Sequence, residues 1–213
     1  MKKIAISLVL VVAVSFIFYC ASRETYVDDN VHSRVIYDFE DVVANPENYP
    51  DYSIEVFDSC SAYIDEIMSD ENVNSDIKNN ILPTENEANI VYARYKDKVA
   101  VTDKYSISPY YYIKFIVDNG KVNGIDSITA AAIDLKDDGK SRSFNGAMLY
   151  LNESNSGIYQ CIWGNIYKSG KTTFRQDNTE TLMRVEYSVD LNGNPRDSVS
   201  FDSQRGIYFQ FNK

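Results

Sequence analysis

Residues 110–121 read Tyr-Tyr-Tyr-Ile-Lys-Phe-Ile-Val-Asp-Asn-Gly-Lys, and this stretch decides the fold class. Ile113, Phe115 and Val117 fall on alternate positions, which is the period of a β-strand. The Asn-Gly pair at 119–120 favours a tight turn, because both residue types tolerate the positive φ of a two-residue hairpin. The stretch therefore predicts a strand that turns back into an antiparallel neighbour. Since adjacent strand residues face opposite sides, at least one of the three tyrosines points away from the main core.

The same alternation continues towards the C-terminus. Residues 183–191 and 207–211 alternate apolar with polar side chains, while residues 158–167 are apolar on both faces and predict the most buried strand. No stretch after Pro83 has the length and period of a crossover helix, so neighbouring strands are expected to be antiparallel. Turns between strands are expected at 118–121, 137–140, 169–171, 192–195 and 204–206.

Before Pro83 the apolar residues recur at the spacing of a helix. An apolar stripe recurs there at helical spacing, and Asp58 or Ser59 stands where an N-cap is expected. Shorter helices are expected just before Pro46 and over residues 76–82. The stripe that predicts the main helix is Cys60, Tyr63, Ile64, Ile67 and Met68.

Together these patterns predict one α+β domain over residues 34–213, with a helical part at 34–83 and an antiparallel sheet at 84–213. We expect short N-terminal helices followed by a curled or closed antiparallel β-meander of eight or nine strands, because a sheet of that length must hide its edges. The main helix would cover an open face or plug one end. An eight-stranded calycin-like barrel and a cystatin-like helix wrapped by a sheet both fit this order of elements.

The first 22 residues have the layout of a secretory signal peptide. Lys2 and Lys3 precede an uncharged, mostly apolar run from Ile4 to Phe18, and small residues beginning with Cys20 follow. This segment resembles the signal of a bacterial lipoprotein. The resemblance implies lipidation of Cys20 and a membrane partner reached through a lipid anchor.

Two alternatives to lipidation stay open, because Ile17, Phe18 and Tyr19 are bulkier than the residues that usually precede a lipidated cysteine. Ordinary cleavage after Ser22 would release a secreted or periplasmic protein, and an uncleaved segment would act as a signal anchor. In all three cases the domain lies outside the cytoplasm, because the N-terminal lysines stay inside. Residues 23–33 would form a polar tether between the membrane end and the domain.

Charge and composition exclude several classes of function. The chain has 31 Asp and Glu against 21 Lys and Arg, a net charge of -10, which argues against binding to nucleic acid. Its one histidine, His32, falls in the expected tether, so His-based catalysis and most zinc sites have no support. Motifs for phosphate loops, dinucleotides and serine nucleophiles are missing, and the Asp-rich stretches at 134–139 and 190–195 depart from the calcium-loop pattern. We therefore expect no metal and no cofactor.

Two further cysteines follow Cys20. Cys60 and Cys161 would either pair as a disulfide in an oxidising compartment or remain two separate buried thiols. No CxxC motif occurs in the sequence, so thiol redox chemistry is unsupported.

The sequence contains 17 tyrosines, and three aromatic side chains are candidate ligand contacts: Tyr111, Trp163 and Tyr167. We expect a non-enzymatic cell-envelope protein that binds an unidentified ligand or envelope protein through its sheet. The alternative is an envelope hydrolase that uses carboxylate acid and base residues, although the many acids single out no catalytic pair. An aromatic-lined hollow would favour the binding protein, whereas clustered acids with perturbed pKa values would favour the enzyme.

Overall fold

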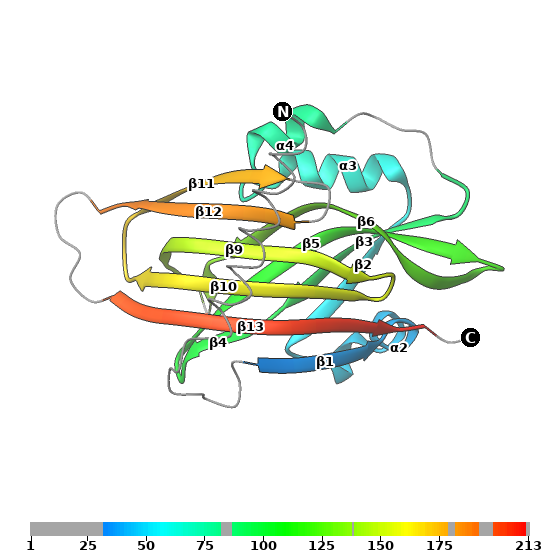
Figure 1. Ribbon diagram of the computed structural model, residues 1–213, viewed down its shortest axis with the longest axis horizontal. Helices are drawn as coiled ribbons and strands as arrows, with labels where there is room; N and C mark the ends of the chain where they lie inside the picture. Colours follow the sequence, from blue (N-terminus) through cyan, green and yellow to red (C-terminus); the bar gives the residue numbers. More distant parts are fainter. Residues whose placement is uncertain (1–31, 82–86, 138, 179–181, 192–197, 212–213) are drawn as a thin grey trace, which may run out of the picture. The chain divides into compact units, whose positions relative to one another are not determined.

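The computed structural model describes residues 32–81, 87–137, 139–178, 182–191 and 198–211 (Figure 1). The chain divides into two units, residues 1–31 and 32–213, and the elements described below belong to the second. The predicted signal segment with Cys20, and the tether as far as residue 31, lie outside the described residues. None of the described helices is long and apolar enough to cross a membrane.

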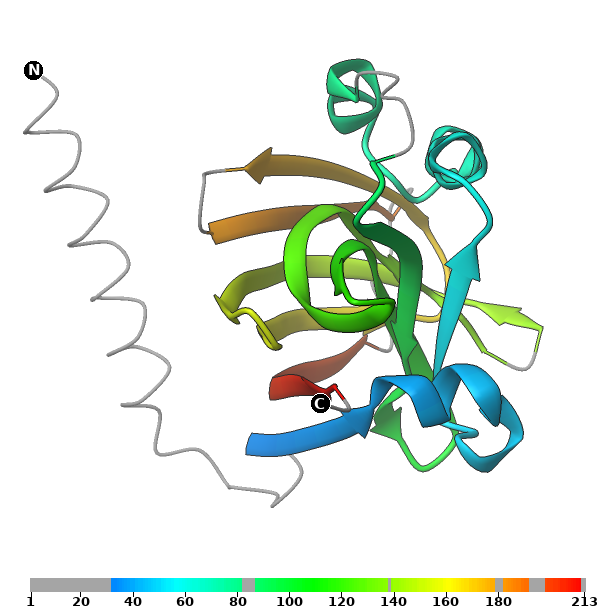
Figure 2. The same ribbon diagram turned by 90° about the vertical axis from the view of Figure 1, so that its right-hand side faces the viewer.

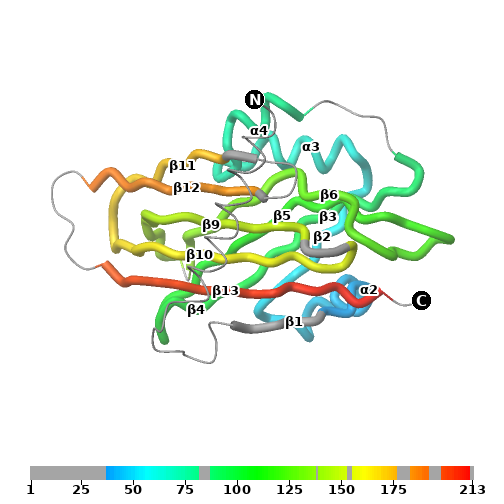
Figure 3. Tube along the Cα trace, in the orientation of Figure 1, coloured from blue at the N-terminus to red at the C-terminus, as the bar shows by residue number. Residues whose placement is uncertain are grey.

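One sheet has six strands in the order β1-β13-β10-β9-β12-β11. Strand β1 runs parallel to β13, and every other pair in this sheet is antiparallel. The long strands β9, β10 and β13 run side by side along most of their length (Figure 3). The bounds in chain order are β1 His32–Asp38, β9 Ser143–Ser154, β10 Gly157–Tyr167, β11 Lys171–Asn178, β12 Leu182–Asp190 and β13 Ser198–Gln210.

The second sheet has five antiparallel strands. Strands β3 and β4 follow one another along the same side of β5, β6 lies along the other side of β5, and β2 lies outside β3. A two-stranded hairpin, β7 (Lys136–Asp137) with β8 (Lys140–Ser141), follows this sheet. The bounds of the five strands are β2 Tyr52–Phe57, β3 Ile90–Asp97, β4 Val99–Thr102, β5 Tyr105–Asp118 and β6 Lys121–Asp134.

The stretch at 110–121 forms the predicted hairpin. Strands β5 and β6 pair through the register Asp118↔Lys121, and only Asn119 and Gly120 lie between them. Both turn residues have positive φ, at 51° and 77°, as the Asn-Gly pair predicts. This hairpin supplies the two longest strands of the five-stranded sheet.

The main core lies between the two sheets. On β5 it takes Tyr111, Ile113 and Phe115, which are fully buried, and on β10 it takes Ile158 and Ile162. Tyr111 donates a hydrogen bond across the core to Gln160 of β10, and its ring lies edge-on to Tyr150 of β9 at 5.1 Å between centroids. The two sheets therefore bury their inner faces against each other (Figure 2).

A second, smaller core lies on the opposite face of the five-stranded sheet. Helix α3 (Cys60–Ser69) packs there through Cys60, Tyr63 and Ile67 against Tyr110 and Tyr112 of β5. Of the two predicted caps, Ser59 caps the helix by accepting a hydrogen bond from the Ala62 amide. The tyrosine run at 110–112 thus serves both cores, because alternate residues of one strand face opposite layers.

The other helices are short and lie where they are expected. Helix α2 covers Phe39–Ala44 and ends before Pro46, and a 3-10 turn covers Pro46–Asn48. Helix α4 covers Ser75–Asn80 and is capped by Asn74, whose side chain accepts from the Asp76 amide. Two strands, β1 and β2, also fall before Pro83, and the helical period there gave no sign of either.

The structure is mostly β with few short helices, but its sheets are not the expected curled or closed meander. Neither sheet is closed or strongly curled, and β13 inserts between β1 and β10 while β9 pairs with β12. The strands hide their apolar faces by dividing into two stacked sheets, so closure is not needed to bury them. The prediction of closure assumed that all strands share one sheet.

Two predicted turns also differ from the structure. Residues 204–206 lie inside β13, where Gly206 pairs with Tyr159 of β10 and the strand continues unbroken. The turn at 169–171 does form, but it joins β10 to β11, which are not neighbours in the sheet. The turn predicted at 192–195 lies outside the described residues. The pattern of turn residues therefore located the strand ends at 118–121, 137–140 and 169–171 without specifying which strands pair.

The two cysteines of the domain occupy different layers. Cys60 lies in the core under α3, whereas Cys161 lies on β10 between Gln160 and Ile162. Both thiols are buried and no disulfide joins them. The structure thus shows the second of the two alternatives, two separate buried thiols.

A pair of glycines lets β9 and β10 approach closely. Gly146 and Gly164 lie directly opposite each other, and the buried ring of Phe144 covers both. A Cβ added at Gly146 would overlap the Trp163 carbonyl oxygen and lie 2.7 Å from Gly164 Cα and 2.8 Å from Phe144 Cζ. Two of these neighbours are backbone atoms, which cannot move aside alone.

We therefore expect Gly146→Ala to lower the free energy of unfolding by about 2 kcal/mol or more, in the range found for overpacked cores. Equilibrium unfolding in urea measures this directly. Gly124→Ala is the matched control on β6, because its nearest neighbour would be 3.3 Å away, and a much smaller loss is expected. Equal losses for the two variants would contradict the close approach of β9 and β10.

The buried tyrosines predict sensitivity to alkaline pH. Burial is the first cause that raises the pKa of Tyr95, Tyr111, Tyr150 and Tyr187 above the usual value near 10. A folded-state pKa above the unfolded one gives stability that is fully present below pH 10 and is lost as the pH rises further. Absorbance at 295 nm should show these side chains ionising together with loss of the far-UV circular dichroism signal. Gradual ionisation of every tyrosine in a domain that stays folded would contradict this burial.

Candidate functional site

A hollow of about 450 Å³ opens where the β4–β5 turn, the end of β10 and the start of β13 come together. This volume is typical of sites for small molecules. We call it the basic hollow, because the described residues that line it include four cations. The lining residues are Val101, Thr102, Lys104, Tyr105, Lys140, Arg142, Ile166, Tyr167, Lys168, Ser198 and Val199.

Strand ends position these side chains. Lys104 lies in the turn between β4 and β5, which closes through the pair Thr102↔Tyr105 and a 3.2 Å hydrogen bond from the Lys104 amide to Thr102 Oγ1. Tyr167 is the last residue of β10 and pairs with Ser198, the first residue of β13. The hollow is thus assembled from both sheets at one end of their strands.

The described charged side chains that line the basic hollow are all positive. No Asp or Glu occurs among the described lining residues, although the whole chain carries -10. Lys104, Lys140 and Arg142 form no ion pair within the part of the chain that the structure describes. Their positive charge is therefore not neutralised by a described carboxylate.

Tyr105 and Arg142 contact each other at the hollow and share a hydrogen-bond acceptor. The Arg142 guanidinium lies over the Tyr105 ring, 5.3 Å from its centroid, a cation–π arrangement. The Tyr105 hydroxyl donates to the Leu135 carbonyl at 2.9 Å, and the Arg142 amide donates to the same oxygen at 3.1 Å. Burial raises the pKa of Tyr105, so its hydroxyl stays protonated at neutral pH.

Aliphatic side chains border the cations. Ile166 is buried and belongs to the main core, while Val199 is 41% exposed and is one of the few large apolar side chains at the described surface. Val101 is half-buried beside them. The basic hollow therefore offers apolar surface next to positive charge, a combination that suits an organic anion.

The predicted aromatic contacts are not brought together. Tyr167 lines the basic hollow. Tyr111 is 0% exposed and lies between the sheets, where it bonds to Gln160. Trp163 is half-buried on β10 and is not among the lining residues of the hollow.

The cations of the hollow were missed by the sequence analysis. Lys104, Lys140 and Lys168 each follow or lie in a turn between strands, and they are far apart in the sequence. Lysine at a turn is ordinary for an exposed side chain, so the residue type gave no signal. These lysines can be recognised as one site only when the strand pairing is known, because that pairing brings their turns to the same hollow.

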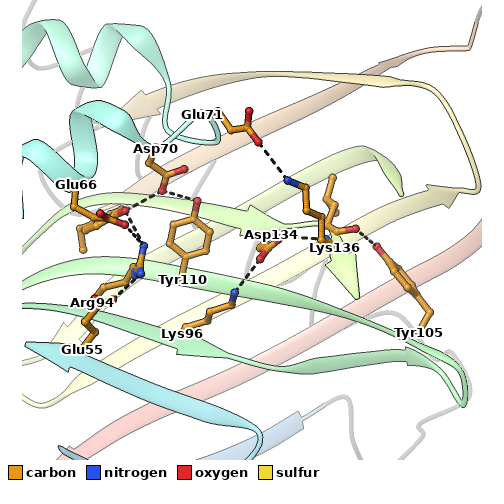
Figure 4. A network of polar contacts seen from close by, with 12 residues as sticks. Glu55, Glu66, Asp70, Glu71, Arg94, Lys96, Tyr105, Tyr110, Asp134 and Lys136 are labelled. Carbon is orange, nitrogen blue, oxygen red and sulfur yellow. Dashed lines mark hydrogen bonds and ion pairs between the residues drawn. The ribbon is translucent and has the colours of Figure 1, made fainter. Parts of the chain in front are cut away.

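A second polar network lies under α3 (Figure 4). Arg94 of β3 pairs with Glu55 and Glu66 at 2.6 Å each. At the end of the helix, Asp70 accepts hydrogen bonds from the hydroxyls of Tyr110 at 2.7 Å and Tyr112 at 2.9 Å. Here each acid has a donor from the sheet, so this network holds the helix on the sheet.

Lysines complete that network at its margin. Lys96 pairs with Asp134 at 2.8 Å, and Lys136 lies 3.5 Å from Glu71 (Figure 4). Burial is the largest single influence on Asp134 and raises its pKa, but the hydrogen bond from Lys96 and other contacts together outweigh burial and lower the pKa overall. Asp134 is therefore held as a carboxylate, which is the state that a structural ion pair needs.

One described carboxylate, Asp97, is buried, with 2% of its surface exposed. It lies 2.7 Å from Arg205 Nη1, and burial raises its pKa while Arg205 opposes that shift. No second Asp or Glu is buried among the described residues. The described residues also contain no group of three or more His, Cys, Asp and Glu side chains placed to hold a metal ion.

These observations stand without a relative to interpret them, because no protein-family model, no curated protein and no solved structure matches the chain.

Proposed function

We propose that this chain is an exported, membrane-anchored protein of the cell envelope whose domain binds a small ligand at the basic hollow without turning it over. The observation that carries the proposal is the hollow itself, where Lys104, Lys140 and Arg142, which pair with no described acid, lie beside two tyrosines and apolar surface. The N-terminal layout of Lys2, Lys3 and the apolar run to Phe18 supports export.

The contrast between the two polar regions supports a binding role for the hollow. Glu55 and Glu66 share Arg94, and Asp134 pairs with Lys96. The pair between Arg94 and Glu66 holds α3 on the sheet. Lys104, Lys140 and Arg142 of the hollow make no such contact with described acids, and like charges gathered at one place repel each other. A bound anion would relieve that repulsion, so the arrangement suits a ligand better than it suits folding.

The hydrolase alternative has less support. A glycosidase-type mechanism needs two carboxyl groups across a cleft, one of them with a raised pKa. Asp97 has the raised pKa, but its two oxygens accept hydrogen bonds from the Lys98 amide and from Arg205. The basic hollow has no described carboxylate.

Membrane attachment is tested by Cys20→Ala in the natural host. If Cys20 is lipidated, the wild-type protein should fractionate with membranes and carry a modified cysteine by mass spectrometry, whereas the variant should lose the lipid. Release of the variant into the soluble extracytoplasmic fraction is the expected result. An intact Met1 on a soluble cytoplasmic protein would contradict export altogether.

Binding at the hollow is tested by filling it. Val199→Trp places a large ring at its rim, and Val56→Trp is a matched control, because Val56 on β2 is also 41% exposed but does not line the hollow. Each protein is incubated with a small-molecule extract of the host envelope, desalted, and denatured, and the released molecules are identified by mass spectrometry.

The wild type and Val56→Trp should retain a small molecule that Val199→Trp loses, and the retained molecule should be chemically unchanged. Retention of the same molecules by all three proteins would contradict a ligand site at the basic hollow. Conversion of the molecule during incubation would contradict a purely binding role.

A further inference from the structure

The number of cations in the basic hollow restricts the charge of its ligand. Four Lys or Arg side chains line it, and Lys104, Lys140 and Arg142 pair with no described acid. A monocarboxylate would neutralise one of these charges and leave the others facing one another. A phosphate monoester carries a charge of about -1.5 to -2 near neutral pH and so neutralises more of them.

The donors of the hollow also suit a phosphate group. The lysines and Arg142 present only N–H donors, and the terminal oxygens of a phosphate monoester are strong acceptors. Lysine binds phosphate as a point charge, and arginine binds it through paired hydrogen bonds, so both kinds of cation in the hollow suit a phosphate group. Arg142 is the single arginine among the described lining residues, and its guanidinium already lies on the Tyr105 ring.

The charge of the whole chain argues that the anion is small. At physiological salt, charges act over about 8 Å, so the cations of the hollow attract a group only when it is close. A long polyanion would also pass over the surface of a chain that carries -10, and would be repelled there. A compact ligand meets the local positive charge alone.

Apolar side chains indicate that the ligand has more than a phosphate group. Val101, Ile166 and Val199 line the hollow beside the cations, and its volume of about 450 Å³ is far larger than inorganic phosphate needs. Building on the proposed binding function, we infer that the basic hollow takes a small phosphomonoester joined to an organic part, either a soluble phosphorylated metabolite or a phosphatidate-type lipid headgroup.

Calorimetric titration of the full chain in detergent tests this inference. Phenyl phosphate is the probe, and benzoate is the matched monocarboxylate. Phenyl phosphate should bind roughly tenfold more tightly, since additional charge-assisted hydrogen bonds each contribute on that scale. Affinity for phenyl phosphate should fall several-fold between pH 7.5 and 5.5, because its second pKa lies near 6, while benzoate binding should change little over this range.

Substitutions then assign the binding to the hollow. Lys104→Gln and Arg142→Gln should each weaken phenyl phosphate binding by roughly tenfold. Lys121→Gln is the control, because Lys121 is also an exposed lysine beside a β5 turn but does not line the hollow. Unchanged urea unfolding midpoints would show that the variants are folded.

The source of the phosphate is distinguished by two further probes, glycerol 3-phosphate and monomeric dihexanoyl phosphatidic acid. Tighter binding of the first supports a soluble metabolite, and tighter binding of the second supports a lipid headgroup. Equal affinity for phenyl phosphate and benzoate, or a full effect of Lys121→Gln, would overturn the phosphate inference. If Val199→Trp still abolished retention of another small molecule, the binding function would stand with a different ligand class, whereas no effect of Val199→Trp on any ligand would overturn the function itself.

Discussion

Burial of strand β5 on both faces joins the layers of this domain. Tyr111 bonds to Gln160 across the core between the sheets, while Tyr110 and Tyr112 bond to Asp70 at the end of α3. A strand with one wet face would serve only one of these cores. Because alternate residues of β5 belong to different layers, shifting its register by one residue would exchange the two sets of tyrosines and disrupt both cores.

Local features of the structure were predictable, and long-range pairing was not. The alternation at 113–117, the Asn119-Gly120 turn and the helical spacing of α3 each specify conformation through near neighbours, and the structure confirms all three. The predicted stripe of α3 is wrong at Met68, which is 48% exposed. The partner of a strand depends on contacts between distant segments, such as β13 with β10. The expected closed meander is wrong for that reason, since turns at 118–121 and 169–171 look alike in sequence but only the first joins paired strands.

The candidate site was not predictable, because its residues come together only through long-range strand pairing. Residues that specify the fold lie in the middle of long strands, where Gly146 and Gly164 bring β9 and β10 together and Phe144 seals them. The cations of the basic hollow lie at strand ends, where substitution costs the core little. Of the three predicted aromatic contacts, Tyr167 lines the hollow, and no periodicity of the sequence distinguishes it from Tyr111, which fills the core.

The most direct measurement of this architecture is the pattern of nuclear Overhauser contacts made by neighbouring rings of β5. The account predicts contacts from Tyr111 to Tyr150 of β9, whose ring centroids lie 5.1 Å apart, and contacts from Tyr112 to Tyr63 of α3, at 5.8 Å. Neither ring should contact the other's partner. Contacts from Tyr111 and Tyr112 to the same layer, or a Tyr111 ring exposed to solvent, would contradict the claim that alternate residues of β5 pack in two different cores.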